Sequence, residues 1–65
     1  MKIDEIKKAV NDGEKVFYSS KNYQVIKDKN DNYFIKCLSN NNFIGLTWLD
    51  GKTLNGNEND FFIEN

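Results

Sequence analysis

The stretch that decides the fold is Tyr23-Gln24-Val25-Ile26-Lys27-Asp28-Lys29-Asn30-Asp31-Asn32-Tyr33-Phe34-Ile35-Lys36-Cys37-Leu38. It places a polar turn between two apolar segments. Residues 23–27 and 33–38 are rich in the β-branched and aromatic side chains that are typical of strands. Residues 28–32 contain only Asp, Asn and Lys, and such a cluster predicts a turn. The stretch therefore predicts two neighbouring antiparallel strands.

The length of this turn decides which side chains share a face of the sheet, because one residue of slip inverts a strand. We expect an odd length, which gives the more apolar face. That face carries Tyr23, Val25, Tyr33, Ile35 and Cys37. An even length would instead put Ile26 on the same face as Ile35. The opposite face still carries Ile26, Phe34 and Leu38, so one short helix would leave it for another copy or a ligand.

Outward from this hairpin, a helix is expected over residues 3–12. Ile3, Ile6 and Val10 recur at helical spacing and form one apolar stripe. Gly13 stands where a left-handed residue commonly closes a helix. A helix of about ten residues is marginal by itself, so we expect it to lie on a sheet.

The rest of the chain is predicted as short strands joined by polar turns. The Asp50-Gly51 pair is a typical two-residue hairpin turn. Further strands are expected at 15–19, 43–49, 52–54 and 60–64, with turns at 20–22, 39–42 and 55–59. The predicted fold class is α+β: one short N-terminal helix packed on an antiparallel β-meander of four to six strands, in a single small domain covering residues 1–65.

Chain length limits the core that this domain builds. A chain of 65 residues buries only about 60% of the surface that its unfolded form exposes. One Cys forms no intramolecular disulfide, and without His the usual zinc sets are incomplete. Self-association is the remaining common source of stability at this size, so a homo-oligomer is expected.

The charges argue against a duplex-DNA partner. Nine Lys and ten acidic residues are interspersed, and there is no Arg to supply a bidentate fork for guanine or phosphate. No apolar run approaches the about 20 residues of a membrane span, and the amphipathic N-terminal segment lacks a signal-peptide core. The single Cys fits a reducing compartment. We expect a cytoplasmic protein without membrane partners.

The side chains offer little for catalysis. Without His, a Ser–His or Cys–His arrangement cannot form. Cys37 alternates with Ile35 and is interpreted as a small buried hydrophobic residue. Asp50, Glu58 and Asp60 are interpreted as turn caps and solvated loop charges, without calcium-loop spacing. We therefore expect no catalytic residue, no metal site and no cofactor.

Nine aromatic residues exceed what one small core requires. Phe17, Phe34, Phe61 and Phe62 are assigned to the core. Trp48 stands beside the Asp50-Gly51 turn, where core or oligomer packing and ligand contact are both open. The residues selected as a ligand- or partner-binding site are Thr47, Trp48, Asp50, Thr53 and Asn55.

The motif Gly45-Leu46-Thr47-Trp48-Leu49-Asp50-Gly51-Lys52-Thr53-Leu54-Asn55-Gly56, followed by Asp60-Phe61-Phe62, resembles a group of small proteins encoded by bacteriophages and prophages. The likeness extends to Glu5-Ile6-Lys7-Lys8-Ala9-Val10 and to Tyr23-Gln24-Val25-Ile26. Lys2 departs from the Thr or Ser that caps the helix in that pattern. The resemblance implies a phage origin, a helix-plus-sheet protein and a location in the bacterial host cytoplasm.

The two leading functional hypotheses are both non-catalytic roles in phage counter-defence. One is sequestration of a small nucleotide-derived immune signal, suggested by the surplus aromatics beside Thr and Asn side chains. The alternative is an inhibitor that binds and blocks a host defence protein, with the Trp48 hairpin or the free sheet face as anchor. Single-stranded nucleic-acid binding through aromatic stacking is a third, less favoured reading.

Overall fold

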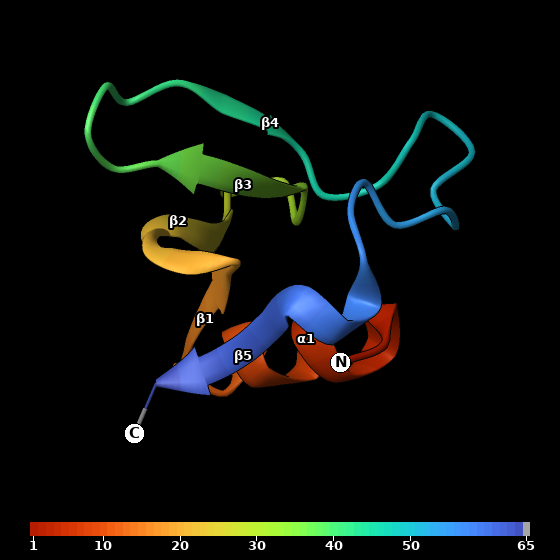
Figure 1. Cartoon of the computed structure of the whole chain (residues 1–65). Coiled ribbons are helices and arrows are strands. Elements are labelled where there is room, and N and C mark those ends of the chain that lie inside the picture. The colour runs from red at the N-terminus through yellow and green to blue at the C-terminus, as the bar shows by residue number, and fades with distance from the viewer. Residues whose placement is uncertain (65) are drawn as a thin grey trace.

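A computed structural model describes residues 1–64 and shows one α-helix against a five-stranded antiparallel sheet (Figure 1). The elements are α1 (Ile3–Asn11), β1 (Lys15–Tyr18), β2 (Ser20–Lys27), β3 (Tyr33–Cys37), β4 (Phe43–Gly45), the 3₁₀ turn η1 (Glu58–Asp60) and β5 (Phe61–Glu64). This arrangement confirms the predicted α+β class. Asn65, the last residue of the expected domain, lies outside the described residues.

The first four strands form a meander, and β5 then crosses to the far edge, giving the order β4-β3-β2-β1-β5. Figure 1 shows β4 at the top of the view, β5 beside α1 at the bottom, and the chain between them running down one side. The strand predicted over 43–49 ends at Gly45, as β4. The strand predicted over 52–54 is replaced by a single bridge between Thr47 and Leu54. Leu46, the residue after β4, still donates its N–H to the Tyr33 carbonyl at 3.0 Å, and its side chain is buried in the core.

The register of the central hairpin confirms the expected odd turn. Val25 pairs with Ile35, and Lys27 pairs with Tyr33 across a five-residue loop. Asp28 holds this loop, because one of its carboxylate oxygens accepts from the backbone N–H groups of Asn30 (2.8 Å) and Asn32 (3.0 Å). These hydrogen bonds lower the pKa of Asp28, with the Asn32 N–H as the largest cause.

The ends of α1 follow the sequence closely. Gly13 has φ +84°, its N–H bonds the Val10 carbonyl (3.1 Å), and the next N–H, of Glu14, reaches Ala9 (3.0 Å). The positive φ confirms the left-handed residue predicted at Gly13, and the two hydrogen bonds together form a Schellman motif. At the other end Glu5 accepts the Lys2 backbone N–H at 2.9 Å, which supplies half of a capping box without a Thr or Ser.

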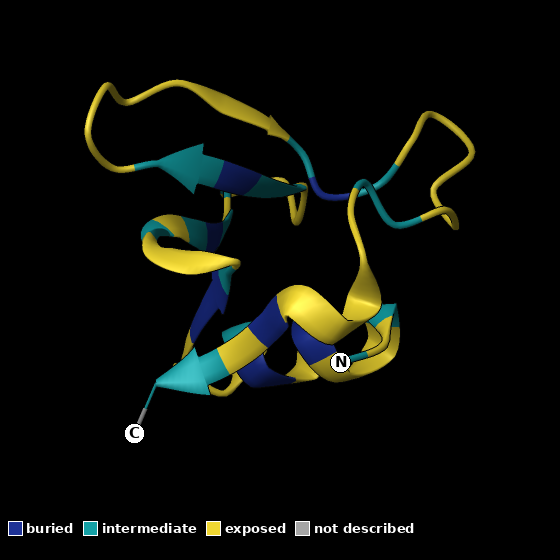
Figure 2. Cartoon of the chain, viewed as in Figure 1, coloured by how far each residue is buried: buried dark blue, intermediate teal, exposed yellow. Residues whose placement is uncertain are grey.

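The core lies between α1 and one face of the sheet, where the helix contacts β1 and β2. Its buried members are Ile6, Ala9, Val16, Val25, Ile35, Leu46 and Phe61. Every sheet strand except β4 contributes at least one residue, and Leu46 joins from the segment after β4. Figure 2 shows this contrast, with the buried colour on α1 and the inner strands and the exposed colour along β4.

The assignment of four Phe residues to the core is confirmed for Phe17 and Phe61, which are buried, and wrong for the other two. Phe34 is half-buried and Phe62 is exposed. The pairing of β1 with β5 aligns Phe62 with Phe17 on the face turned away from the helix, where the Phe62 side chain is left at the surface. The two rings pack against each other there, with their centroids 5.8 Å apart.

The turn expected at 20–22 is also misplaced. β2 already begins at Ser20, and the reversal occurs at Ser19, which has φ +63° and donates its N–H to Asp60 (2.8 Å). A register shift between Phe17 and Tyr18 absorbs the extra residues. The long-range bond to Asp60 fixes a turn that local sequence does not reveal.

Candidate functional site

Four of the five predicted site residues lie in one loop, residues 47–54, which we call the Trp48 loop, and the fifth, Asn55, directly follows it. Its two ends are joined by the bridge between Thr47 and Leu54, and the Trp48 N–H donates to the Thr53 carbonyl at 2.8 Å. The Gly51 N–H returns to the Trp48 carbonyl at 2.9 Å, and Gly51 has φ +71°. The turn therefore centres on Leu49 and Asp50, one residue earlier than the predicted Asp50-Gly51 turn.

Asp50 holds this turn together. Its Oδ1 accepts from the backbone N–H groups of Lys52 and Thr53, both at 2.9 Å, and its Oδ2 accepts the Thr53 hydroxyl at 2.6 Å. The Thr53 hydroxyl is the largest cause of a lowered Asp50 pKa, followed by the two N–H groups. Asp50 and Thr53 thus stabilise the loop rather than presenting free groups to a ligand.

Asn55 and Leu46 attach the loop to the domain. The Asn55 N–H donates to the Leu46 carbonyl at 2.8 Å, and its side-chain amide donates to the Gly45 carbonyl at 3.3 Å. Leu46 is only 1% exposed and belongs to the core. The loop is therefore anchored to the core by a buried side chain and braced by hydrogen bonds.

The Trp48 loop exposes two large apolar side chains, those of Trp48 and Leu49. Trp48 is 64% exposed and is therefore not part of the core, which leaves oligomer packing and ligand contact as its two alternatives. Leu49 is fully exposed at the centre of the turn and was missed in the sequence. A four-residue turn ending on Gly, which is a common type I pattern, would have placed Leu49 at the tip.

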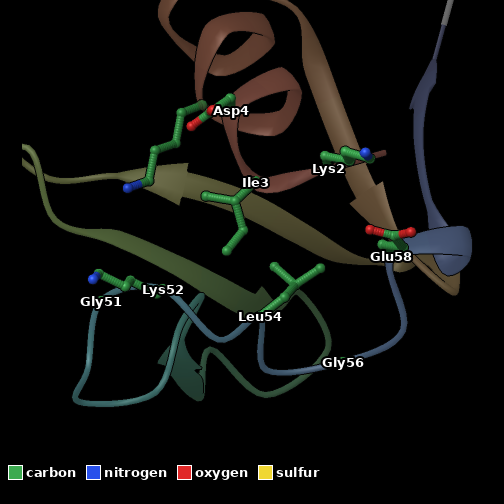
Figure 3. A pocket seen from close by; sticks show the side chains of 9 residues that line it. Lys2, Ile3, Asp4, Gly51, Lys52, Leu54, Gly56 and Glu58 are labelled. Carbon is green, nitrogen blue, oxygen red and sulfur yellow. The ribbon is translucent and has the colours of Figure 1, made fainter.

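A groove runs between the N-terminal turn of α1 and the segment formed by the second half of the Trp48 loop and the residues that follow it. Its volume is about 650 Å³, and Figure 3 shows lysine side chains at its rim, with Ile3 and Leu54 facing one another across it. The lining residues are Lys2, Ile3, Asp4, Lys7, Gly51, Lys52, Leu54, Gly56 and Glu58. None of the five predicted site residues is among them.

The three lysines of this groove form no ion pair within residues 1–64, and the same is true of Lys15, Lys29 and Lys36 outside it. The ion pairs among residues 1–64 are Lys8–Asp12, Lys21–Glu64 and Lys27–Asp31. None includes Lys2, Lys7 or Lys52, although Asp4 and Glu58 share the groove. Lys7 instead lies over the Tyr33 ring, with its Nζ 5.3 Å from the centroid.

A second, smaller hollow of about 520 Å³ also borders the Trp48 loop. Thr47 and Leu49 contribute to its wall, together with Asn32 and Tyr33. Lys7 and Gly51 line both hollows. Of the predicted site residues, Thr47 lines this second hollow.

Cys37 differs from its interpretation as a buried hydrophobic residue. It is half-buried, and its Sγ lies 3.5 Å from the Asn22 amide and 3.3 Å from the Ser39 hydroxyl. The Ser39 hydroxyl is the main cause of a lowered pKa of this thiol. The polar turn after β3 reaches back to Cys37, which alternation within the strand did not reveal.

No group of three or more Cys, Asp or Glu side chains within residues 1–64 is arranged to hold a metal ion. In the same part of the chain, no helix is long and apolar enough to cross a membrane.

Comparisons with models of protein families, with curated protein sequences and with solved structures found no match to this chain.

Proposed function

We propose that this chain is a non-catalytic binding protein that blocks a protein partner, with the Trp48 loop as its anchor. The observation that carries this proposal is the exposure of Trp48 and Leu49 on a loop whose backbone is already bonded to itself. Exposed Trp side chains are frequent hot spots of protein interfaces. A loop held in its bound shape loses little conformational entropy on association.

The polar side chains of the loop support this role. Asp50 and Thr53 bond each other and the turn backbone, so both carboxylate oxygens of Asp50 already accept hydrogen bonds before a partner approaches. The phage origin implied by the resemblance suggests a host defence protein as the partner. Blocking by occupancy requires only binding, which is compatible with a chain that has few catalytic groups.

The test begins with a pull-down from lysate of the bacterial host, followed by titration of the purified partner. We expect Trp48→Ala to weaken binding by about 30-fold or more, the effect of losing a hot spot of about 2 kcal/mol. Leu49→Ala should weaken it less. Phe62→Ala removes an exposed aromatic side chain from β5 and is the matched control.

If Phe62→Ala weakens the titration as much as Trp48→Ala, the Trp48 loop is not the anchor. Full binding by the doubly substituted Trp48→Ala, Leu49→Ala protein would overturn the proposal outright.

A second function, sequestration of a small nucleotide-like ligand, is favoured by the groove. Its volume of about 650 Å³ falls within the range of small-molecule sites, roughly 300–1,000 Å³. Lys2, Lys7 and Lys52 are cations suited to phosphate, and Ile3 with Leu54 offers an apolar wall. Asp4 and Glu58 oppose an anion there, which is why this candidate stands second.

Calorimetric titration with a panel of cyclic nucleotides tests this second function. Binding that weakens in Lys52→Ala and not in Lys29→Ala, a lysine of the 28–32 turn outside the groove, would support it. Absence of heat with every nucleotide would remove it and leave the protein-blocking proposal untouched.

A further inference from the structure

We propose that a second copy of this chain pairs with the open edge of β4, joining two sheets into one about a two-fold axis at Phe43. β4 ends the strand order on one side, so only its β3 side is paired within the chain. Figure 2 shows it as an exposed strand far from the helix. This proposal does not rest on the proposed function, because it uses a different surface from the Trp48 loop.

The register identifies which backbone groups face outward. Cys37 N–H bonds the Asn42 carbonyl at 2.7 Å, Leu46 N–H bonds the Tyr33 carbonyl at 3.0 Å, and Ile44 pairs with Ile35. The backbone N–H and C=O groups of residues 42, 44 and 46 therefore face β3. The backbone groups of successive residues face opposite edges of a strand, so those of Phe43 and Gly45 face the open edge.

Asn55 limits the part of the edge that is free. Its side-chain amide already donates to the Gly45 carbonyl at 3.3 Å. What remains is the N–H and C=O of Phe43 together with the N–H of Gly45. An antiparallel copy centred on Phe43 satisfies both groups of that residue, because the two Phe43 residues then exchange N–H···O bonds.

Charge distinguishes this edge from the other one. Cys37 to Leu49 form a run of thirteen residues without a charge, in a chain of which 29% is charged. Natural edge strands are commonly protected by Lys, Pro or inward charges, and β4 has none of these. On the far edge β5 ends on Glu64, which Lys21 holds at 2.9 Å.

A two-fold axis makes the absence of charge meaningful. It places a residue at the axis directly opposite its own copy, so a charged residue there would meet a like charge. Phe43 instead meets Phe43, and it is 59% exposed in the single chain. It also lies edge-on to Phe34, with the centroids 5.2 Å apart, so pairing would gather four aromatic rings on the outer face.

Light scattering during size-exclusion chromatography of the full chain tests the proposal. We expect a mass of twice 7.6 kDa that falls to 7.6 kDa for Phe43→Lys, because two ammonium groups then face each other. Leu49→Lys, an equal change on the Trp48 loop, should leave the dimer intact. A wild-type protein that stays monomeric at its highest soluble concentration would overturn the proposal, as would a dimeric Phe43→Lys protein.

Crosslinking gives a result that does not depend on how Phe43→Lys folds. In a Cys37→Ser background, Phe43→Cys places two thiols in a directly opposed pair, with Cα atoms about 5.5 Å apart, which suits a disulfide. We expect a covalent dimer under mild oxidation, formed faster than in Leu49→Cys. Equal or slower crosslinking at residue 43 would overturn the axis.

The two proposals fail separately. Leu49→Lys should lose affinity for the blocked partner and keep the dimer, whereas Phe43→Lys should lose the dimer and keep one functional Trp48 loop per chain. A Phe43→Lys protein that stays dimeric while Leu49→Lys becomes monomeric would show that the copies meet through the Trp48 loop instead, and would overturn the β4 pairing.

Discussion

The segment from α1 to β3 and the segment from residue 38 to residue 54 use their apolar side chains in opposite ways. In the first, Ile6, Val16, Val25 and Ile35 are buried against one another. In the second, only Leu46 is fully buried, and the backbone is held by polar side chains. A small chain can thus fix a loop with Asp and Asn and leave its Trp and Leu free for contact.

Leu46 and Leu49 offer the largest contrast between the two uses, because they are the same residue type three positions apart. We expect Leu46→Ala to lower the free energy of unfolding by about 2–5 kcal/mol, the range for a buried Leu in a tight core. Leu49→Ala should change it by less than about 0.5 kcal/mol. Urea unfolding followed by circular dichroism measures both.

For a chain of this size, the loss at Leu46 approaches the total stability, which at about 0.1 kcal/mol per residue is roughly 6 kcal/mol. A Leu49→Ala protein that unfolds as readily as Leu46→Ala would contradict the division into buried and displayed residues.

Two glycines, Gly56 and Gly51, should give intermediate losses of stability when a Cβ is added. A Cβ at Gly56, which has φ +150°, would lie 2.7 Å from the Tyr18 ring, and that ring packs on Phe61 at 4.6 Å. Gly51 has φ +71° and open space around it. We expect Gly56→Ala to cost about 2–4 kcal/mol, from strain and displaced packing, and Gly51→Ala about 1 kcal/mol, from strain alone.

Thermal unfolding of the two glycine variants, monitored side by side, checks this order. Equal losses would mean that Tyr18 moves aside without cost, and the contact of Gly56 with the core would then be unimportant for stability.

Sequence patterns predicted the parts of this fold that depend on neighbours along the chain. Gly13 closes α1 as expected, and the odd turn at 28–32 puts Val25 beside Ile35. Contacts between distant residues were not predictable in this way. The crossing of β5 to β1 moved Phe62 to the outer face, and the Asp60 carbonyl moved the first turn to Ser19.

The candidate site shows the same division. Composition identified the segment that contains Trp48, Asp50 and Thr53, and the structure brings these residues into one loop. Their roles could not be assigned from residue type, since Asp50 and Thr53 bond to each other and to the turn backbone. The groove was missed altogether, because it joins α1 to residues more than forty positions away in the sequence.

The smallest effect expected is the response of the Trp48 loop to acid. Hydrogen bonds from Thr53 and Lys52 lower the pKa of Asp50 below its ordinary value of 3.8. A lowered pKa in the folded state means that the carboxylate stabilises the loop above pH 3.8 and that this contribution is lost as the pH falls through the lowered value.

NMR amide shifts of Lys52 and Thr53, followed from about pH 6 to about pH 2, should show one transition below 3.8. Asp50→Asn keeps an acceptor oxygen but no titrating charge, so this transition should disappear in that variant while the shifts of the Asp28 turn still change. A midpoint at or above 3.8 would mean that the carboxylate does not hold the turn in solution, and that Trp48 and Leu49 are displayed on a loop less rigid than its hydrogen bonds suggest.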